Sequence, residues 1–270
     1  MTLYTSKEHA FVICAYKENP HLPECVESLL SQESKSDVYM VTSTPNEYIS
    51  NICEKNNIPL FVNTGDKGLA QDWNFAVDTA TAAEKRLITI AHQDDVYDPD
   101  YLTTILALVN KSKKPLIAYT EYYEIRNGEK VFSNKLLRIK RFMNFLLRFR
   151  IFQKSKKIRR MILSIGDPIC CPAVTFACEN LTIPMFDINF VTACDYKAWV
   201  DFSLYKGDFL YSKKQLMGHR IHPDSATSAN IINNSKAEED FIIFSSFWPK
   251  WIAKILSHQY RKAEKSNEIN

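Results

Sequence analysis

The most informative stretch of this chain is Ile88-Thr89-Ile90-Ala91-His92-Gln93-Asp94-Asp95-Val96-Tyr97-Asp98-Pro99. Its apolar first part stops at two adjacent carboxylates, Asp94 and Asp95, as a buried strand does at its end. Open α/β sheets bind ligands beyond the carboxyl ends of their strands. Neighbouring carboxylates repel each other unless a cation bridges them, and a hard divalent cation that also holds phosphate oxygens is the usual partner. The segment predicts a ligand site at a strand end; the alternative is a solvated acidic turn.

The residues around this segment predict alternating strands and helices. Asp98 and Pro99 predict the N-cap and first position of a helix. Continuous apolar runs predict strands at 9–15, 38–41, 59–62 and 86–91. Amphipathic segments predict helices after Asn19-Pro20, after a capping box at 44–47 headed by Thr44, and after the glycine turn at 65–68. This alternation is typical of a parallel sheet with helices on both faces.

The second half of the chain is less regular. Apolar runs predict a strand at 115–119, a hairpin over 122–132, and strands near Phe209 and Leu216. Helices are predicted at 195–205 and at 241–255. No repeat or linker divides the chain, so we expect one domain over residues 1–225, with a basic helical insert at about 135–165. Residues 226–270 are expected to form a C-terminal helical segment packed on the same domain.

The composition indicates a globular protein. The chain has 270 residues, of which 46% are hydrophobic, enough for a substantial core. It shows neither a signal peptide nor an apolar run of about 18 residues that could span a membrane. Its 7 cysteines are odd in number and irregularly spaced, which favours reduced thiols. A cytoplasmic location is therefore predicted.

The net charge of +3 conceals a strongly basic insert. Residues 135–160 contain 11 basic residues and no acidic one, while the rest of the chain has 23 basic and 31 acidic residues. Apolar residues alternate with these cations, a pattern typical of an interfacial amphipathic helix at an anionic membrane. The alternative is a long helix packed on the domain with a solvated basic face. No nucleic-acid-binding motif accompanies the patch, so nucleic acid is not an expected partner.

Five ordered motifs carry a family resemblance. They are Ala15-Tyr16-Lys17-Glu18, Asp72-Trp73-Asn74 after the glycine turn, His92-Gln93-Asp94-Asp95, the segment 193–199 around Asp195, and the segment 219–225. Over roughly residues 8–225 the chain resembles the family 2 glycosyltransferases of the GT-A fold, most closely bacterial enzymes of surface-polysaccharide assembly. The resemblance implies a Rossmann-like α/β fold whose mostly parallel sheet is flanked by helices.

The resemblance also implies roles for particular residues. Asp195 matches the carboxylate that acts as catalytic base, and Asp94, Asp95 and His222 match residues of the metal site. A divalent cation, Mn or Mg, is the implied cofactor, and either aspartate can be its main ligand. Residues matching the donor-binding positions are Ala15, Tyr16, Glu18, Thr42, Gly68, Asn74, Gln93, Asp94 and Arg220. Ser225 lies close enough in sequence to approach the diphosphate.

The implied activity is an inverting transfer of a sugar from a nucleoside diphosphate sugar to a glycan or lipid-linked acceptor, in cell-surface polysaccharide synthesis. A metal-held diphosphate leaves while a carboxylate takes the acceptor proton. Membrane association at the inner face through 135–160 would suit a lipid-linked acceptor.

The chain departs from the family pattern at three positions. His92 stands in place of an aspartate, and Cys194 in place of a glutamate. The segment 41–44 lacks the carboxylate that commonly recognises uracil, which leaves the nucleobase of the donor open. A UDP-sugar is the expected donor, and dTDP-rhamnose is the alternative. Two other classes are a nucleotidyltransferase and a non-catalytic nucleotide-binding scaffold. The loop 16–20 contains no glycine, which argues against a triphosphate loop.

Overall fold

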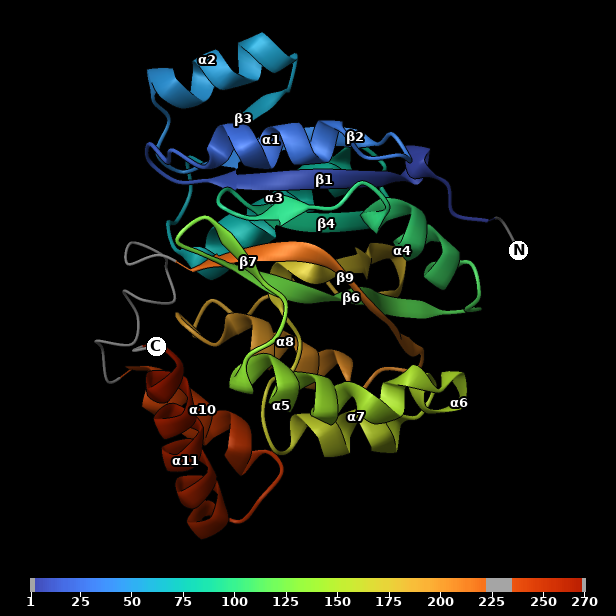
Figure 1. Cartoon of the computed structure of the whole chain (residues 1–270), viewed down its shortest axis with the longest axis vertical. Helices are drawn as coiled ribbons and strands as arrows, with labels where there is room; N and C mark the ends of the chain where they lie inside the picture. The colour runs from blue at the N-terminus through green and yellow to red at the C-terminus, as the bar shows by residue number, and fades with distance from the viewer. Residues whose placement is uncertain (1–2, 222–234, 269–270) are drawn as a thin grey trace.

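A computed structural model describes residues 3–221 and 235–268, and shows a mixed sheet with helices on both faces (Figure 1). The strands are β1 (His9–Ala15), β2 (Asp37–Thr42), β3 (Leu60–Val62), β4 (Leu87–His92), β5 (Val96–Tyr97), β6 (Pro115–Arg126), β7 (Glu129–Val131), β8 (Val174–Ala177) and β9 (Asp208–Ile221). Their order is β3-β2-β1-β4-β8-β6-β9-β5, with β7 paired to β6. The predicted α/β class is confirmed.

The parallel part of the sheet is its N-terminal half. Strands β3, β2, β1 and β4 are mutually parallel, joined by helices α1 (Leu22–Leu30), α2 (Glu47–Asn56) and α3 (Leu69–Ala82). In the C-terminal half, β8 runs antiparallel to both β4 and β6, whereas β6 and β9 are parallel. The two strands predicted near Phe209 and Leu216 are one long strand, β9, with register shifts where it pairs with β6.

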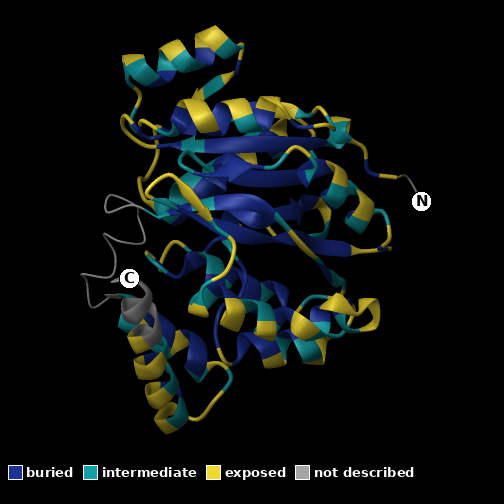
Figure 2. Ribbon diagram, in the orientation of Figure 1, coloured by how far each residue is buried: buried dark blue, intermediate teal, exposed yellow. Residues whose placement is uncertain are grey.

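Two apolar layers cover the sheet. On β1, the side chains of Phe11 and Ile13 pack with α1, α2 and α4 (Tyr101–Val109). The alternate residues Ala10 and Val12 pack toward α3, α8 (Cys194–Phe202) and the C-terminal helices. This alternation follows from the two-residue period of a strand. The central strands β1, β4, β6 and β8 are buried between these layers (Figure 2).

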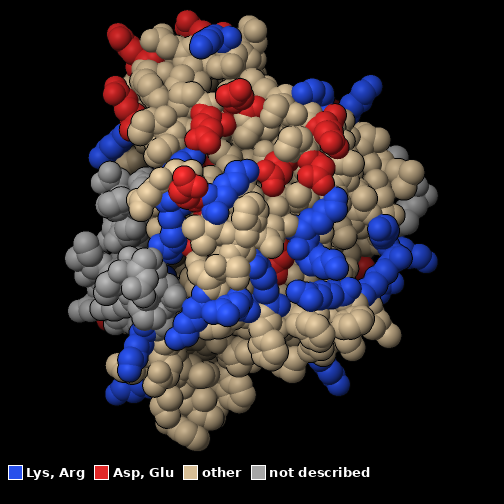
Figure 3. Space-filling model, in the orientation of Figure 1, with Lys and Arg blue, Asp and Glu red and all other residues tan. Residues whose placement is uncertain are grey.

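The basic insert folds as several short helices instead of one long one. These are α5 (Lys135–Met143), the 3-10 helix η2 (Asn144–Arg148), α6 (Arg150–Gln153) and α7 (Lys156–Leu163). Asn134 and Ser155 cap two of them, accepting hydrogen bonds from Leu137 and Ile158 backbone N–H groups. Lys and Arg side chains gather over this layer (Figure 3). Shorter 3-10 helices are η1 (Ser6–Glu8), η3 (Cys171–Ala173) and η4 (Cys178–Asn180).

The predicted C-terminal helix is two helices, α10 (Ser235–Ser245) and α11 (Lys250–Glu268). Pro249 lies between them, where it cannot donate the backbone hydrogen bond that a continuous helix requires. Among residues 3–221 and 235–268, no helix combines the length and apolar character needed to cross a membrane.

Two predicted N-caps are wrong. Helix α4 has Asp100, not Asp98, at its N-cap, because the Asp98 N–H donates to the Leu216 carbonyl (2.9 Å) and continues the β5–β9 pairing. Helix α2 is capped by Asn46, which accepts a hydrogen bond from the Ile49 N–H (2.9 Å). Thr44 instead accepts one from the Lys17 N–H (2.7 Å).

Candidate functional site

Three parallel strands end side by side at the predicted ligand edge. Ala15 and Thr42, the last residues of β1 and β2, are register partners, and Cys14 pairs with His92, the last residue of β4. The loops that follow these strands therefore share one edge of the sheet. The topology of the sheet therefore brings the residues predicted to bind the sugar donor, at the ends of β1 and β2, next to the acidic turn.

The loop after β1 is held by the Gln93 side chain. The Tyr16 N–H donates to Gln93 Oε1 (2.9 Å), and Gln93 Nε2 donates back to the Tyr16 carbonyl (3.1 Å). Lys17 takes a left-handed conformation, with φ of 55°. The Tyr16 ring and the Glu18 side chain are both exposed at this edge. Gln93 thus fixes the backbone that presents the Tyr16 ring.

The glycine turn leads into α3 through a hydrogen-bonded loop. Ser43 Oγ (2.9 Å) and Asn63 Nδ2 (2.8 Å) both donate to the Asp72 carboxylate, which ties the end of β2 to α3. Gly68 is the N-cap with φ of +150°, and a Cβ there would lie 2.3 Å from Gln71 Oε1. Only glycine fits this backbone without strain.

Asn74 was predicted to bind the sugar donor, but its side chain forms hydrogen bonds with backbone groups. Its Oδ1 accepts hydrogen bonds from the Met185 (3.1 Å) and Phe186 (3.0 Å) N–H groups, and its Nδ2 donates to the Phe186 carbonyl (2.8 Å). The side chain is buried. In this arrangement Asn74 holds the segment that precedes α8.

The acidic turn after β4 is clamped by the end of β9. The Arg220 N–H donates to Asp95 Oδ1 (2.9 Å), and Arg220 Nε donates to the Asp94 carbonyl (2.9 Å). Arg220 Nη2 also donates to Glu24 Oε2 of α1 (2.5 Å). His219 Nδ1 lies 3.0 Å and 3.2 Å from the two Asp95 carboxylate oxygens. These contacts fix the fully buried Asp95 carboxylate in one orientation.

Asp95 also governs the charge of His219. Burial opposes protonation of the imidazole, but the Asp95 charge and hydrogen bond outweigh it, so the pKa of His219 is raised. His219 and Glu24 did not stand out as site residues in the sequence. His219 belongs to the motif at 219–225 and precedes Arg220, whereas nothing in the α1 sequence indicates that Glu24 contacts the site.

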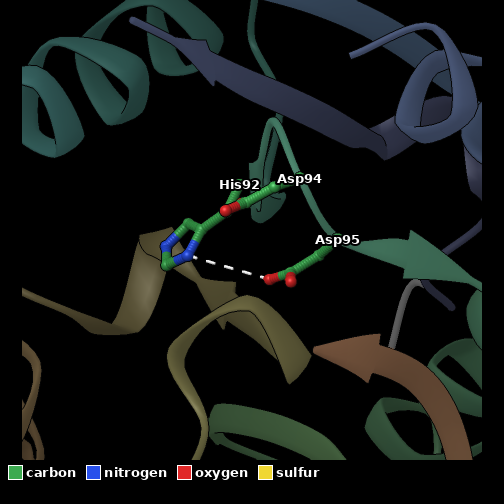
Figure 4. Close-up of side chains that lie close together, drawn as sticks. All are labelled: His92, Asp94 and Asp95. Carbon is green, nitrogen blue, oxygen red and sulfur yellow. Dashed lines mark ion pairs between the residues drawn. The ribbon is translucent and has the colours of Figure 1, made fainter. Parts of the chain in front are cut away.

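The residues of the acidic turn fit a divalent cation. Potential ligand atoms of His92, Asp94 and Asp95 all lie within 4.8 Å of one another. The His92 ring stacks on Trp73 at 5.3 Å with an interplanar angle of 19°, and its Nδ1 faces Asp95 Oδ2 at 3.8 Å (Figure 4). Its buried Nε2 finds no hydrogen-bond partner among the described residues. Carboxylate oxygens and an imidazole nitrogen suit Mn²⁺. His222 and Ser225 lie outside the described residues.

Asp195 lies in the first turn of α8, which packs on the same face of the sheet as α3. Its Oδ1 accepts a hydrogen bond from the Tyr196 N–H (2.8 Å). Burial raises the pKa of the Asp195 carboxyl, against the lowering effects of that hydrogen bond and of Lys236, Lys140 and His92. A partly dehydrated carboxylate with a raised pKa is suited to accepting a proton.

A second carboxyl, Asp167, lies near Asp195. Burial and the charge of Asp195 raise the pKa of Asp167 well above its usual range. Lys140, from the basic insert, acts on both carboxylates, and its ammonium lies 5.6 Å from the Tyr122 ring centroid. Sequence inspection missed both residues, because Asp167 looks like a turn residue before Pro168 and Lys140 is one cation among eleven.

Comparison with known proteins identifies one family. The model described as "Glycosyl transferase family 2" matches residues 10–173, which include the acidic turn and the loops after β1 and β2. No curated protein sequence matches the chain.

Solved structures show the same fold at low sequence identity. The S. aureus protein TarS 1-349 in complex with UDP-GlcNAc is 14% identical, with a TM-score of 0.60 over 93% of this chain and 71% of that one. The mannosyltransferase PcManGT from Pyrobaculum calidifontis, in complex with GDP-Man and Mn²⁺, is 15% identical, with a TM-score of 0.60 over 96% of this chain and 70% of that one. Against the longer TarS chain, this chain covers 42% of its length.

Proposed function

Because the chain belongs to glycosyl transferase family 2, we propose that it transfers a sugar, with inversion, from a nucleoside diphosphate donor to an acceptor hydroxyl. The observation that carries this proposal is the clamped acidic turn. Asp94 and Asp95, fixed by Arg220, stand at the edge where three parallel strands end.

The donor site would lie between the loop after β1 and the acidic turn. The exposed Tyr16 ring, on a backbone fixed by Gln93, offers a flat apolar surface for a nucleobase. The structural neighbours carry UDP-GlcNAc and GDP-Man, so both nucleotides belong in a donor screen. We propose a UDP-sugar as donor, with dTDP-rhamnose as the alternative.

Asp94, Asp95 and His92 would hold a divalent cation. The mannosyltransferase neighbour is in complex with Mn²⁺. A bound Mn²⁺ or Mg²⁺ supplies Lewis-acid stabilisation of the leaving diphosphate. The buried Asp95 carboxylate is held by contacts from Arg220 and His219, so the protein orients this ligand before the metal binds.

Asp195 would act as the catalytic base. The acceptor oxygen bonds to the anomeric carbon while the bond from that carbon to the diphosphate oxygen breaks. The acceptor proton passes to an Asp195 carboxylate oxygen, and the nucleoside diphosphate leaves with the bonding electron pair. A single displacement of this kind inverts the anomeric configuration.

The insert would bring this site to a membrane that carries a glycan or lipid-linked acceptor. Its exposed cations are Lys135, Arg138, Arg148, Arg150, Lys154, Lys156 and Lys157. Among the apolar side chains interspersed with them, Phe142 is 80% and Ile151 75% exposed. Cations beside exposed apolar side chains suit an anionic leaflet, where each charge contributes about 1 kcal/mol. We propose peripheral membrane association in surface-polysaccharide synthesis.

The direct test is turnover of a defined donor panel. Purified chain would be incubated with UDP-GlcNAc, UDP-glucose, GDP-Man or dTDP-rhamnose and Mn²⁺, and release of nucleoside diphosphate would be measured. We expect release from one nucleotide class, stopped by EDTA. The reactions would be run with and without bacterial lipid extract as a source of acceptor. If the chain binds a nucleotide tightly but releases no nucleoside diphosphate from any donor, a non-catalytic scaffold is favoured.

A further inference from the structure

A glutamate from the C-terminal helix α10 binds the backbone at the start of α8. Glu239 Oε1 accepts a hydrogen bond from the Val191 N–H (2.8 Å). Its Oε2 accepts from the Thr192 N–H (3.0 Å), the Thr192 hydroxyl (2.8 Å) and the Ala193 N–H (2.8 Å). The carboxylate is buried. One side chain, more than 45 residues away in sequence, therefore holds three consecutive backbone amides directly before Asp195.

Helix α8 has no side-chain cap from its N-cap residue. Its N-cap residue is Ala193, whose side chain offers no acceptor for the orphan amides of a helix start. A carboxylate at this end also interacts favourably with the helix dipole. Glu239, from another helix, accepts from the N-cap amide of Ala193 and from the two amides before it, and places a negative charge at this helix end.

The position of α10 is itself fixed against α8. Phe244 of α10 is fully buried and its ring lies 6.1 Å from that of Tyr196, with the planes at 76°. Phe244 also contacts Tyr260 of α11 at 5.9 Å. Lys236, one turn before Glu239, acts electrostatically on Asp195. The C-terminal helices thus pack against the helix that carries the proposed base.

We propose that Glu239 is a positioning residue for Asp195, so that the C-terminal segment completes the catalytic site. Glu239 does so by holding residues 191–193 at the start of the helix that carries the base, an arrangement called the Glu239 cap below. The inference rests on the proposed function for the role of Asp195, but the hydrogen bonds that carry it do not. Loss of the cap would let residues 191–195 move, and a displacement of about 1 Å at a reacting group can cost on the order of 10²-fold in rate.

Amide hydrogen exchange tests the cap without any substrate. Glu239→Ala should raise exchange at the amides of Val191, Thr192 and Ala193, and Glu239→Gln, which keeps one acceptor oxygen, should give an intermediate increase. Glu238→Ala removes an exposed carboxylate from the same helix and is the matched control. Unchanged exchange at 191–193 in Glu239→Ala would overturn the cap. If that variant does not fold, the same measurement on Glu239→Gln decides.

Steady-state kinetics test the positioning. With whichever donor of the panel the wild type turns over, Glu239→Ala should lower kcat by about 10- to 100-fold while the donor KM changes little, because Tyr16, Asp94 and Asp95 lie on other elements. Glu239→Gln should fall between wild type and alanine. Lost exchange protection with unchanged kcat would overturn the positioning role. A wild type inactive with every donor would contradict the proposed function, whereas the exchange result would still decide the cap.

Discussion

At the scale of single residues, Asp195 is the group whose chemistry can be isolated best. Asp195→Asn keeps the size and the hydrogen bond to the Tyr196 N–H but cannot accept a proton. Transfer should fall roughly 10²- to 10⁴-fold while nucleotide binding survives. Asp201→Asn, on the same helix and paired at the surface with Lys197, is the control and should retain activity. Equal losses of donor affinity and rate in Asp195→Asn would make Asp195 a binding residue instead.

The raised pKa of Asp195 predicts the pH profile. The base works when deprotonated, so activity is present above its pKa and is lost as the pH falls through it. Because burial raises that pKa, the acid limb of kcat/KM should lie at higher pH than an ordinary aspartate would give. This limb should disappear from the residual activity of Asp195→Asn. A limb that persists unchanged in the variant belongs to another group.

Residue types at strand ends were predictable, whereas most of their contacts were not. The positions of Tyr16, Asp94 and Asp95 follow from strand ends that sequence patterns reveal. The hydrogen bond from Arg220 to Asp95 joins residues 125 positions apart and depends on how β9 pairs. No local pattern encodes such a contact, and the same holds for Glu239 beneath α8.

At the scale of elements, the basic insert shows what periodicity does and does not determine. Its amphipathic pattern correctly predicted helix, but the 3-10 helix η2, the extended residue Phe149 and the Ser155 cap divide it into short pieces. One of its cations, Arg159, is buried and donates to the Ser203 (3.1 Å) and Gly207 (2.5 Å) carbonyls. Sequence alone could not separate this structural arginine from the exposed cations.

The exposed cations of the insert predict binding to anionic vesicles. The protein should sediment with phosphatidylglycerol-containing vesicles, and less so as salt rises, because screening weakens surface charge interactions. A triple variant, Arg148→Gln, Lys154→Gln and Lys157→Gln, should reduce this binding. The control, Lys7→Gln, Lys55→Gln and Lys213→Gln, removes the same charge from exposed positions elsewhere and should bind normally. Equal effects of the two triple variants would contradict a role for the insert.

At the scale of the whole molecule, the parallel half of the sheet followed from the sequence and the mixed half did not. Strands β1, β2 and β4 are largely buried apolar runs, and amphipathic helices connect the strands of this half, which local patterns report. Strand β8 enters between β4 and β6 from more than 80 residues beyond β4. Its position results from long-range packing. The family assignment therefore rests on the N-terminal half, while α8 and the C-terminal helices complete the proposed site.

We propose that the acidic turn binds a nucleoside diphosphate through a divalent cation. Isothermal titration calorimetry with UDP and with GDP, in Mn²⁺ and in EDTA, tests it directly on the wild type and on Asp95→Asn, which keeps the shape of the buried side chain. We predict binding of one nucleotide in Mn²⁺, and a large loss of affinity in EDTA or in the variant. Equal nucleotide affinity with and without the metal, or wild-type affinity in Asp95→Asn, would contradict metal-dependent binding at the acidic turn.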